Sequence, residues 1–141
     1  MLKRLRRFSH EDKGDAFMGI TFGILIALIL LLIAVSVYEY RTLKSDIRTA
    51  ANEVLQIMKV ENGADSSTRR KFDDLLIAAG LDPSKVNFVA TPKSVQRGDF
   101  LQVVATREYN IFALKSVGVD HSITMRVQVS GYAHKYIREG D

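Results

Sequence analysis

The sequence of 141 residues contains no cysteine and only two prolines. The absence of cysteine excludes a disulfide framework, a thiolate metal site and a cysteine nucleophile. Neither proline nor glycine interrupts residues 24–60, so nothing in that stretch would stop a helix. The composition has no collagen-like or low-complexity bias, and 47% hydrophobic residues are too many for a disordered chain. The length predicts one compact domain plus an appendage.

Signatures of catalysis are also missing. The three histidines, His10, His121 and His134, have no second ligand at metal-binding spacing. Asp73 and Asp74 are neighbours on a predicted helix, where their side chains point about 100° apart and cannot share a proton. There is no glycine-rich phosphate loop after a strand and no G-x-S-x-G elbow. We therefore predict that the protein is not an enzyme and uses no cofactor or metal.

Charge is absent from Ala16 to Tyr38, a run of 23 residues. A helix rises about 1.5 Å per residue and needs roughly 20 apolar residues to cross a membrane. The sequence therefore predicts one membrane span over about residues 16–38. A cleaved secretory signal is the competing interpretation, because Ala34-Val35-Ser36 fits a signal peptidase site. The apolar core before that site is longer than the usual ~7–15 residues.

Positive charge is concentrated before the apolar run. Five of the first fifteen residues are basic and three are acidic, whereas the remaining 126 carry 15 basic and 13 acidic residues. The positive-inside rule places the N-terminus in the cytoplasm and the larger C-terminal part outside. The residues expected to set this topology or to contact lipid headgroups are Lys3, Arg4, Arg6 and Arg7. The membrane is therefore an expected partner, and nucleic acid is not, because the basic residues lie beside a membrane segment.

The helix is expected to continue beyond the membrane. Apolar residues recur there at spacings of three and four, on one helix face: Leu43, Ile47, Ala50, Val54 and Ile57. The simplest prediction is one helix over residues 15–60, ended by Glu61-Asn62-Gly63. Residues 1–14 form a basic cytoplasmic leader or tail, and residues 61–141 form an extracytoplasmic head that the long helix helps to complete.

The head is predicted to pair a second helix with a small antiparallel sheet, which makes the fold class α+β. Asp65-Ser66-Ser67 offers N-caps for the helix, and Gly80 followed by Asp82-Pro83 would end it. Its predicted buried face is Phe72, Leu75, Leu76 and Ala79. The charged residues Arg69, Arg70, Lys71, Asp73 and Asp74 are expected to form a solvated face of i,i+4 pairs.

Three strands are predicted, with the clearest alternation of apolar and polar residues in the last. They cover Val86–Ala90, Phe100–Glu108 and the alternating residues from Ile123 to His134. Arg97-Gly98-Asp99 matches an adhesion tripeptide, but a tight turn before the second strand explains it better. Residues 111–119 are predicted to form a loop with one helical turn.

Small residues within the apolar run predict a helix–helix contact. Gly19, Gly23 and Ala27 fall on one face at four-residue spacing, where two helix backbones can approach closely. This face is expected to hold an oligomer together or to contact another membrane subunit.

The layout of basic tail, glycine, long half-buried helix and small C-terminal sheet resembles type IV pilin-like proteins. It is most similar to the TadE-type minor pseudopilins of tight-adherence (Flp-type) pilus systems. The matching residues are Lys13-Gly14 before the apolar helix, the helix through about Met58, the segment Gly98–Val104, and the last strand ending in Tyr136-Ile137-Arg138-Glu139. The resemblance implies a structural component of a cell-envelope pilus or of a secretion or conjugation apparatus. Its expected partners are other pilin-like subunits or an envelope assembly complex.

The resemblance also implies a processing site. A prepilin peptidase would cut after Gly14 and leave Asp15 as the new N-terminus. Such proteins usually carry a glutamate five residues after the cut, where this sequence has Gly19. An unpaired ammonium in hydrocarbon is costly, so this departure implies a minor subunit at a filament tip or base. Alternatively Gly14 is not cut, and the protein is a single-pass membrane accessory whose head binds a ligand or regulates a partner complex.

Overall fold

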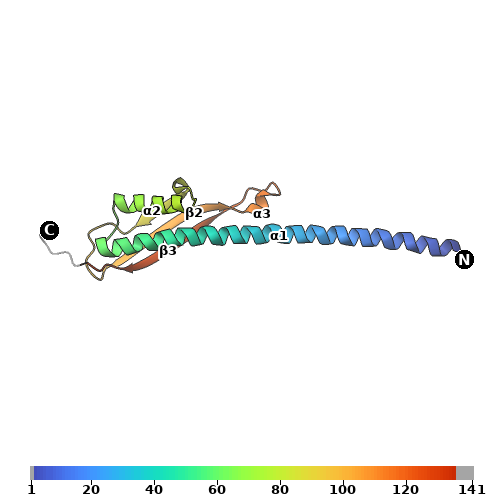
Figure 1. The fold of residues 1–141 in the computed structure, drawn as a ribbon, viewed down its shortest axis with the longest axis horizontal. Helices are drawn as coiled ribbons and strands as arrows, with labels where there is room; N and C mark the ends of the chain where they lie inside the picture. The colour runs from blue at the N-terminus through green and yellow to red at the C-terminus, as the bar shows by residue number, and fades with distance from the viewer. Residues whose placement is uncertain (1, 136–141) are drawn as a thin grey trace.

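The computed structural model describes the backbone of residues 2–135 and the side chains of residues 14–135. The elements follow one another as α1 (Leu2–Glu61), α2 (Ser66–Ala78), a 3-10 turn η1 (Pro83–Lys85), β1 (Val86–Ala90), β2 (Phe100–Asn110), α3 (Phe112–Lys115) and β3 (Ser122–Tyr132). In Figure 1, α1 is a rod that runs nearly the full length of the molecule, and the other elements lie along its C-terminal half. The predicted α+β class is confirmed.

The three strands form one antiparallel sheet in the order β1-β2-β3. In the longer pairing, Val103 lies opposite Val129, and Ala105 lies opposite Val127. These apolar residues are buried, whereas the residues between them on β3 are exposed. The alternation read from the sequence therefore gives the correct inner face of β2 and β3.

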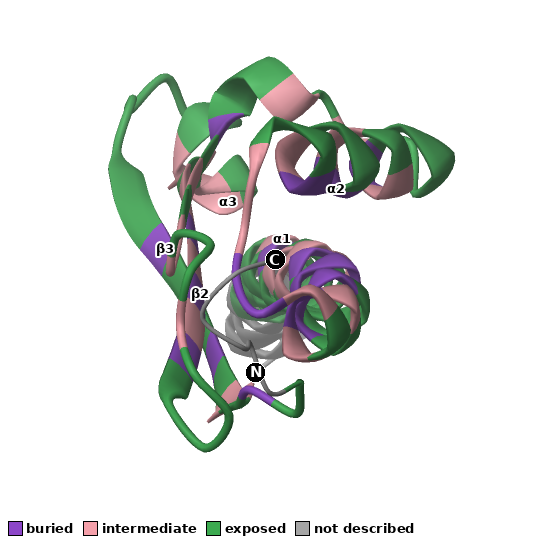
Figure 2. Ribbon diagram, turned by 90° about the vertical axis from the view of Figure 1, so that its left-hand side faces the viewer, coloured by how far each residue is buried: buried purple, intermediate pink, exposed green. Residues whose placement is uncertain are grey.

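The core lies where α1 meets both the sheet and α2. Viewed along α1 in Figure 2, the sheet lies on one side of this helix and α2 lies against another. Phe72 and Leu76 of α2 are fully buried, and the ring of Phe72 lies 4.6 Å from that of Phe88 on β1. The second half of α1 is thus part of the core of the head (residues 62–135), as the sequence predicted.

The buried stripe of α1 is wider than the predicted one. Ile47, Ala50 and Val54 are buried as expected, but Ile57 is only half-buried and Leu43 lies at the edge of the core. Three further residues of α1 are buried: Ala51, Leu55 and Met58. A helix that packs against one surface buries one stripe, but α1 contacts α2 as well as the sheet, so its buried arc is broader.

Helix α2 begins at the predicted cap. The Asp65 side chain accepts hydrogen bonds from the backbone N–H groups of Ser67 and Thr68, and Thr68 closes a capping box. An ion pair with Lys93, together with these donors, holds the pKa of Asp65 well below its ordinary value. The helix ends at Ala78, so the prediction of a buried Ala79 was wrong, and Ala79 is exposed at the C-cap.

The end of α1 is a structural junction. Gly63 N–H donates to the Met58 carbonyl at 3.1 Å, which is the backbone closure expected where an Asn-Gly pair ends a helix. The Asn62 side chain is fully buried and exchanges two hydrogen bonds with the backbone of Lys135, at 2.6 and 3.1 Å. This amide ties the end of α1 to the chain that follows β3.

Gly63 is expected to be much less replaceable than Gly80. Both have positive φ, +125° and +76°, but a Cβ at Gly63 would lie 2.3 Å from the Pro92 carbonyl oxygen, whereas one at Gly80 would meet open space. Gly80→Ala should therefore lose only about 1–2 kcal/mol of unfolding free energy, the cost of the backbone conformation. Gly63→Ala adds an overpacking cost of about 1–3 kcal/mol. Denaturant unfolding of the full chain in detergent, followed by circular dichroism, measures both, and equal losses would contradict the close approach.

The last strand is shorter than predicted. β3 ends at Tyr132, before the His134 expected from the alternation and the Glu139 implied by the resemblance, because its partner β2 begins at Phe100, which lies opposite Tyr132. Beyond the ladder, Ala133 exchanges backbone hydrogen bonds with the turn at Gly98-Asp99. The predicted closing residues Tyr136–Glu139 lie outside the described residues.

Candidate functional site: the apolar helix and its junction with the head

The described structure contains one helix long and apolar enough to cross a membrane, within Gly14–Glu61. Its apolar side chains are exposed from Phe17 to Val35, apart from half-buried Leu32. An exposed apolar surface of this length has no counterpart elsewhere among residues 14–135. We call residues 16–38 the candidate span.

The small residues predicted to form a helix–helix contact lie on this exposed surface. A Cβ added at Gly19 or Gly23 would meet nothing within 4 Å, and Ala27 is exposed. Gly19 also lines an apolar hollow of about 500 Å³, together with Phe17, Phe22 and Leu25. Gly14 and Asp15 are exposed within the same continuous helix. The side chains of Lys3, Arg4, Arg6 and Arg7 lie outside the described residues.

The contact predicted at Gly19 and Gly23 can be tested in a membrane two-hybrid assay. A Cβ at either position now meets open space, so leucine at both would occupy that space and keep two helix backbones apart. We expect Gly19→Leu/Gly23→Leu to lower the association signal of the chain, and Leu28→Ile, on the opposite side of the helix, to leave it unchanged. Association as strong as that of the parent would contradict the contact.

Ser36 connects the candidate span to the head. It is the one buried residue between positions 16 and 38. Its hydroxyl donates to the Leu32 carbonyl at 2.9 Å and accepts the backbone N–H of Ala113, in α3, at 2.8 Å. The segment between β2 and β3 therefore docks against the last turns of the apolar run, as Figure 1 also shows for α3.

Tyr109 of β2 adds a second contact at this junction. Its hydroxyl lies 3.1 Å from the Ser36 carbonyl and 3.2 Å from a Glu39 carboxylate oxygen, and its ring packs edge-on against Tyr40 at 5.6 Å. Burial, and then the hydrogen bond to Glu39, raises the pKa of Tyr109. Next to these groups is an apolar groove of about 310 Å³, lined by Val37, Ile111 and Ile123 among others. The junction is thus packed and hydrogen-bonded rather than a simple linker.

The head carries a second surface of interest, an open pocket of about 500 Å³ between α2, η1 and the sheet. Arg69, Lys85 and Arg107 line it together with Glu108, so cations outnumber anions. The Nε and Nη1 atoms of Arg107 are buried without a hydrogen-bond partner among the described residues. Cationic side chains grouped in this way can bind an anionic ligand group.

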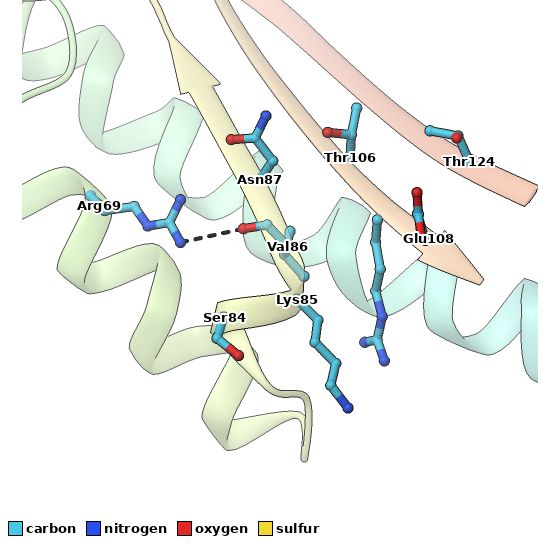
Figure 3. A pocket seen from close by; sticks show the side chains of 9 residues that line it. Arg69, Ser84, Lys85, Val86, Asn87, Thr106, Glu108 and Thr124 are labelled. Atoms are coloured by element: carbon cyan, nitrogen blue, oxygen red, sulfur yellow. Dashed lines mark hydrogen bonds between the residues drawn. The ribbon is translucent and has the colours of Figure 1, made fainter. Parts of the chain in front are cut away.

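The prediction that Arg69 belongs to a solvated charged face of α2 was wrong in part. It pairs with Asp73 at 2.9 Å as the sequence suggested, but it is not simply part of a solvated face. Its guanidinium also donates to the Val86 carbonyl at 3.3 Å and lies 5.6 Å from the ring of Phe88. Figure 3 shows it reaching from α2 to β1 at the edge of the pocket. Arg69 therefore helps to hold α2 on the sheet.

Other residues considered in the sequence form no catalytic cluster in the described part of the chain. His121 and His134 are exposed, and His10 lies outside the described side chains. No group of three or more His, Asp or Glu side chains among residues 14–135 is placed to hold a metal ion. Arg97-Gly98-Asp99 forms the predicted turn, in which the Asp99 carboxylate accepts the Gln96 N–H at 2.8 Å.

Comparison with known proteins gives a family. A family model described as Domain of unknown function (DUF4320) matches residues 24–138. The chain is a member of the DUF4320 family. No curated protein and no solved structure matches it.

The DUF4320 match covers both the head and part of the apolar helix. It begins at Ile24, inside the candidate span, and continues through the head. The unit shared within the DUF4320 family is therefore not the head alone but the head with much of the apolar helix. The junction at Ser36 and Ala113 lies within that unit.

Proposed function

We propose that this DUF4320 protein is a minor pilin-like, TadE-like structural component of a cell-envelope pilus or of a secretion or conjugation apparatus. It acts by helix packing and assembly, without catalysis. Residues 16–38 cross the membrane once, the N-terminus is cytoplasmic and the head is extracytoplasmic. The proposal rests above all on one observation: a single continuous helix is apolar and exposed in its first half and forms the core of a head in its second.

Two further observations support an assembly role. The open face at Gly19, Gly23 and Ala27 offers neighbouring helices a close approach. The head is hydrogen-bonded to the helix through Ser36 and Tyr109, so packing of the helix in a membrane complex would orient the head as well.

Deletion of the gene in its own host tests this function. Pilus assembly or secretion is expected to fail and to be restored by the parent chain. Intact assembly and secretion in the deletion strain would end the proposal. N-terminal sequencing of the mature protein adds detail: a start at Asp15 supports processing as a pilin, whereas an intact Met1 supports a permanent anchor.

A second candidate function is supported by the cationic pocket. A permanently anchored accessory protein could use Arg69, Lys85 and Arg107 to hold an anionic ligand. In that case Lys85→Ala would impair function without changing assembly, because the Lys85 side chain forms none of the ion pairs between described residues. An effect of Lys85→Ala on ligand-dependent function alone would favour this alternative over the structural role.

A further inference from the structure

We propose that the segment Ile111–Val119, called the tip here, inserts its apolar side chains into the lipid interface on the side of the membrane that holds the head. The partner is the boundary between lipid headgroups and acyl chains. This inference goes beyond the pilin-like role and depends only on the assignment of residues 16–38 as a membrane span.

The position of the tip along α1 is the first argument. Ala113 is hydrogen-bonded to Ser36, and Ser36 lies two residues before the end of the uncharged run at Tyr38. Two residues correspond to about 3 Å along a helix axis. If the uncharged run spans the hydrocarbon core, the tip lies at the level of the interface and has lipid beside it.

The chemistry of the tip is the second argument. Three of its large apolar side chains are exposed: Val117 is 66% exposed, Val119 is 51% exposed, and Phe112 is 39% exposed. Exposed apolar residues elsewhere in the head are spread over α2 and the strands, whereas these three lie within eight consecutive residues. Exposed apolar side chains grouped in one short segment are typical of an interaction surface. The single basic side chain of the tip, Lys115, can extend its ammonium toward the headgroups.

The backbone of the tip is the third argument, because unpaired peptide groups are costly near hydrocarbon. The N–H groups of Ser116, Val117 and Gly118 donate to carbonyls of Phe112, Leu114 and Lys115, at 3.0–3.1 Å. The Val119 N–H donates to Leu114 at 2.9 Å, and the Ser116 hydroxyl bonds to the Phe112 carbonyl. The tip therefore exposes Phe112, Val117 and Val119 while the N–H groups of residues 113–119 are satisfied within the protein.

The absence of native cysteine allows a direct test on the full chain. Single cysteines at Val117, Val89 and Leu28 are labelled with an environment-sensitive nitrobenzoxadiazole dye, and each protein is reconstituted into phosphatidylcholine vesicles. The vesicles carry nitroxide quenchers either near the headgroup or deep in the acyl chain. Val89 is 59% exposed, so it matches Val117 in exposure, but it lies in β1, away from the tip.

At Val117 we expect blue-shifted emission and loss of intensity with the shallow quencher, and at Val89 neither. Leu28 should be quenched most strongly by the deep quencher, which verifies the span independently. Emission at Val117 that is as red and as unquenched as at Val89, with Leu28 quenched, would overturn the lipid contact alone. Blue-shifted emission at Val117 without lipid quenching would overturn it in favour of a second copy covering the tip. An unquenched Leu28 would overturn the span and the tip contact together.

None of these outcomes depends on pilus assembly. The tip contact can therefore fail while the pilin-like role survives, and the deletion experiment can fail while the tip contact survives.

Discussion

Phe72→Ala is expected to destabilise the head by about 3–5 kcal/mol, the range for removing a fully buried aromatic side chain. The ring of Phe72 has 0% exposure and lies in the core that α1, α2 and the sheet share. Its loss leaves a cavity between α2 and β1, where it now contacts Phe88. Because stabilities of whole domains are only about 5–15 kcal/mol, the variant is expected to be close to unfolding.

Phe100→Ala provides a matched control for this prediction. It removes the same side chain from the start of β2, where Phe100 is 52% exposed and contacts Tyr132 at the sheet surface. An edge-on aromatic pair contributes about 0.5–1.5 kcal/mol beyond its burial, so the control should lose far less stability. Chemical denaturation of both full-length variants in detergent gives the comparison. If Phe72→Ala lowered the free energy of unfolding no more than Phe100→Ala does, Phe72 would not be a core residue and the described core would be wrong.

Leu28→Arg/Leu31→Arg is expected to prevent membrane integration. Each arginine near the centre of a span costs about 2.5–3.5 kcal/mol on insertion scales. The pair therefore opposes insertion by roughly 5–7 kcal/mol, before the lost leucines are counted. We expect the chain to move from the alkali-resistant membrane fraction to the extractable fraction.

The matched control for insertion places the same two charges in the head. Ile77 and Val89 are both exposed there, so Ile77→Arg/Val89→Arg should remain in the membrane fraction. Retention of the Leu28→Arg/Leu31→Arg chain in the alkali-resistant fraction would mean that residues 16–38 do not anchor the protein. Loss of both variants from that fraction would mean that two added arginines release the protein wherever they are placed, and not that they disrupt the span.

The elements that sequence reasoning placed correctly are those fixed by local chemistry. Asp65 caps α2 through donors two and three residues away, and Asn62-Gly63 ends α1 through bonds within the last turn. The inner faces of β2 and β3 follow from a two-residue period that needs no knowledge of the partner strand. Such signals are contained in a few neighbouring residues.

The contacts that sequence reasoning missed join residues far apart in the chain. Ser36 appeared only as part of a signal peptidase motif, because its partner Ala113 lies 77 positions away. Asn62 was read as a helix terminator, and its bond to Lys135 spans 73 positions. Periodicity reports which face is apolar, but not which distant group will satisfy a polar atom on it.

The width of the buried stripe on α1 and the length of β3 show a related limit. Ala51, Leu55 and Met58 are buried because α1 contacts both α2 and the sheet. The sequence of α1 alone does not indicate how many elements pack against it. The alternating pattern continues to Ala133, which is buried, although the ladder has ended with the first residue of β2. At the end of the sheet, a residue can therefore be buried without belonging to a paired strand.

The central claim is that the chain crosses the membrane once and holds its head outside the cytoplasm. Maleimide labelling of single cysteines in intact cells tests it most directly, since the parent chain has no cysteine to label. A membrane-impermeant maleimide is expected to label Val89→Cys in intact cells and to leave Leu28→Cys unlabelled until the protein is denatured. Labelling of Val89→Cys only after the cells are lysed would place the head in the cytoplasm and contradict the account.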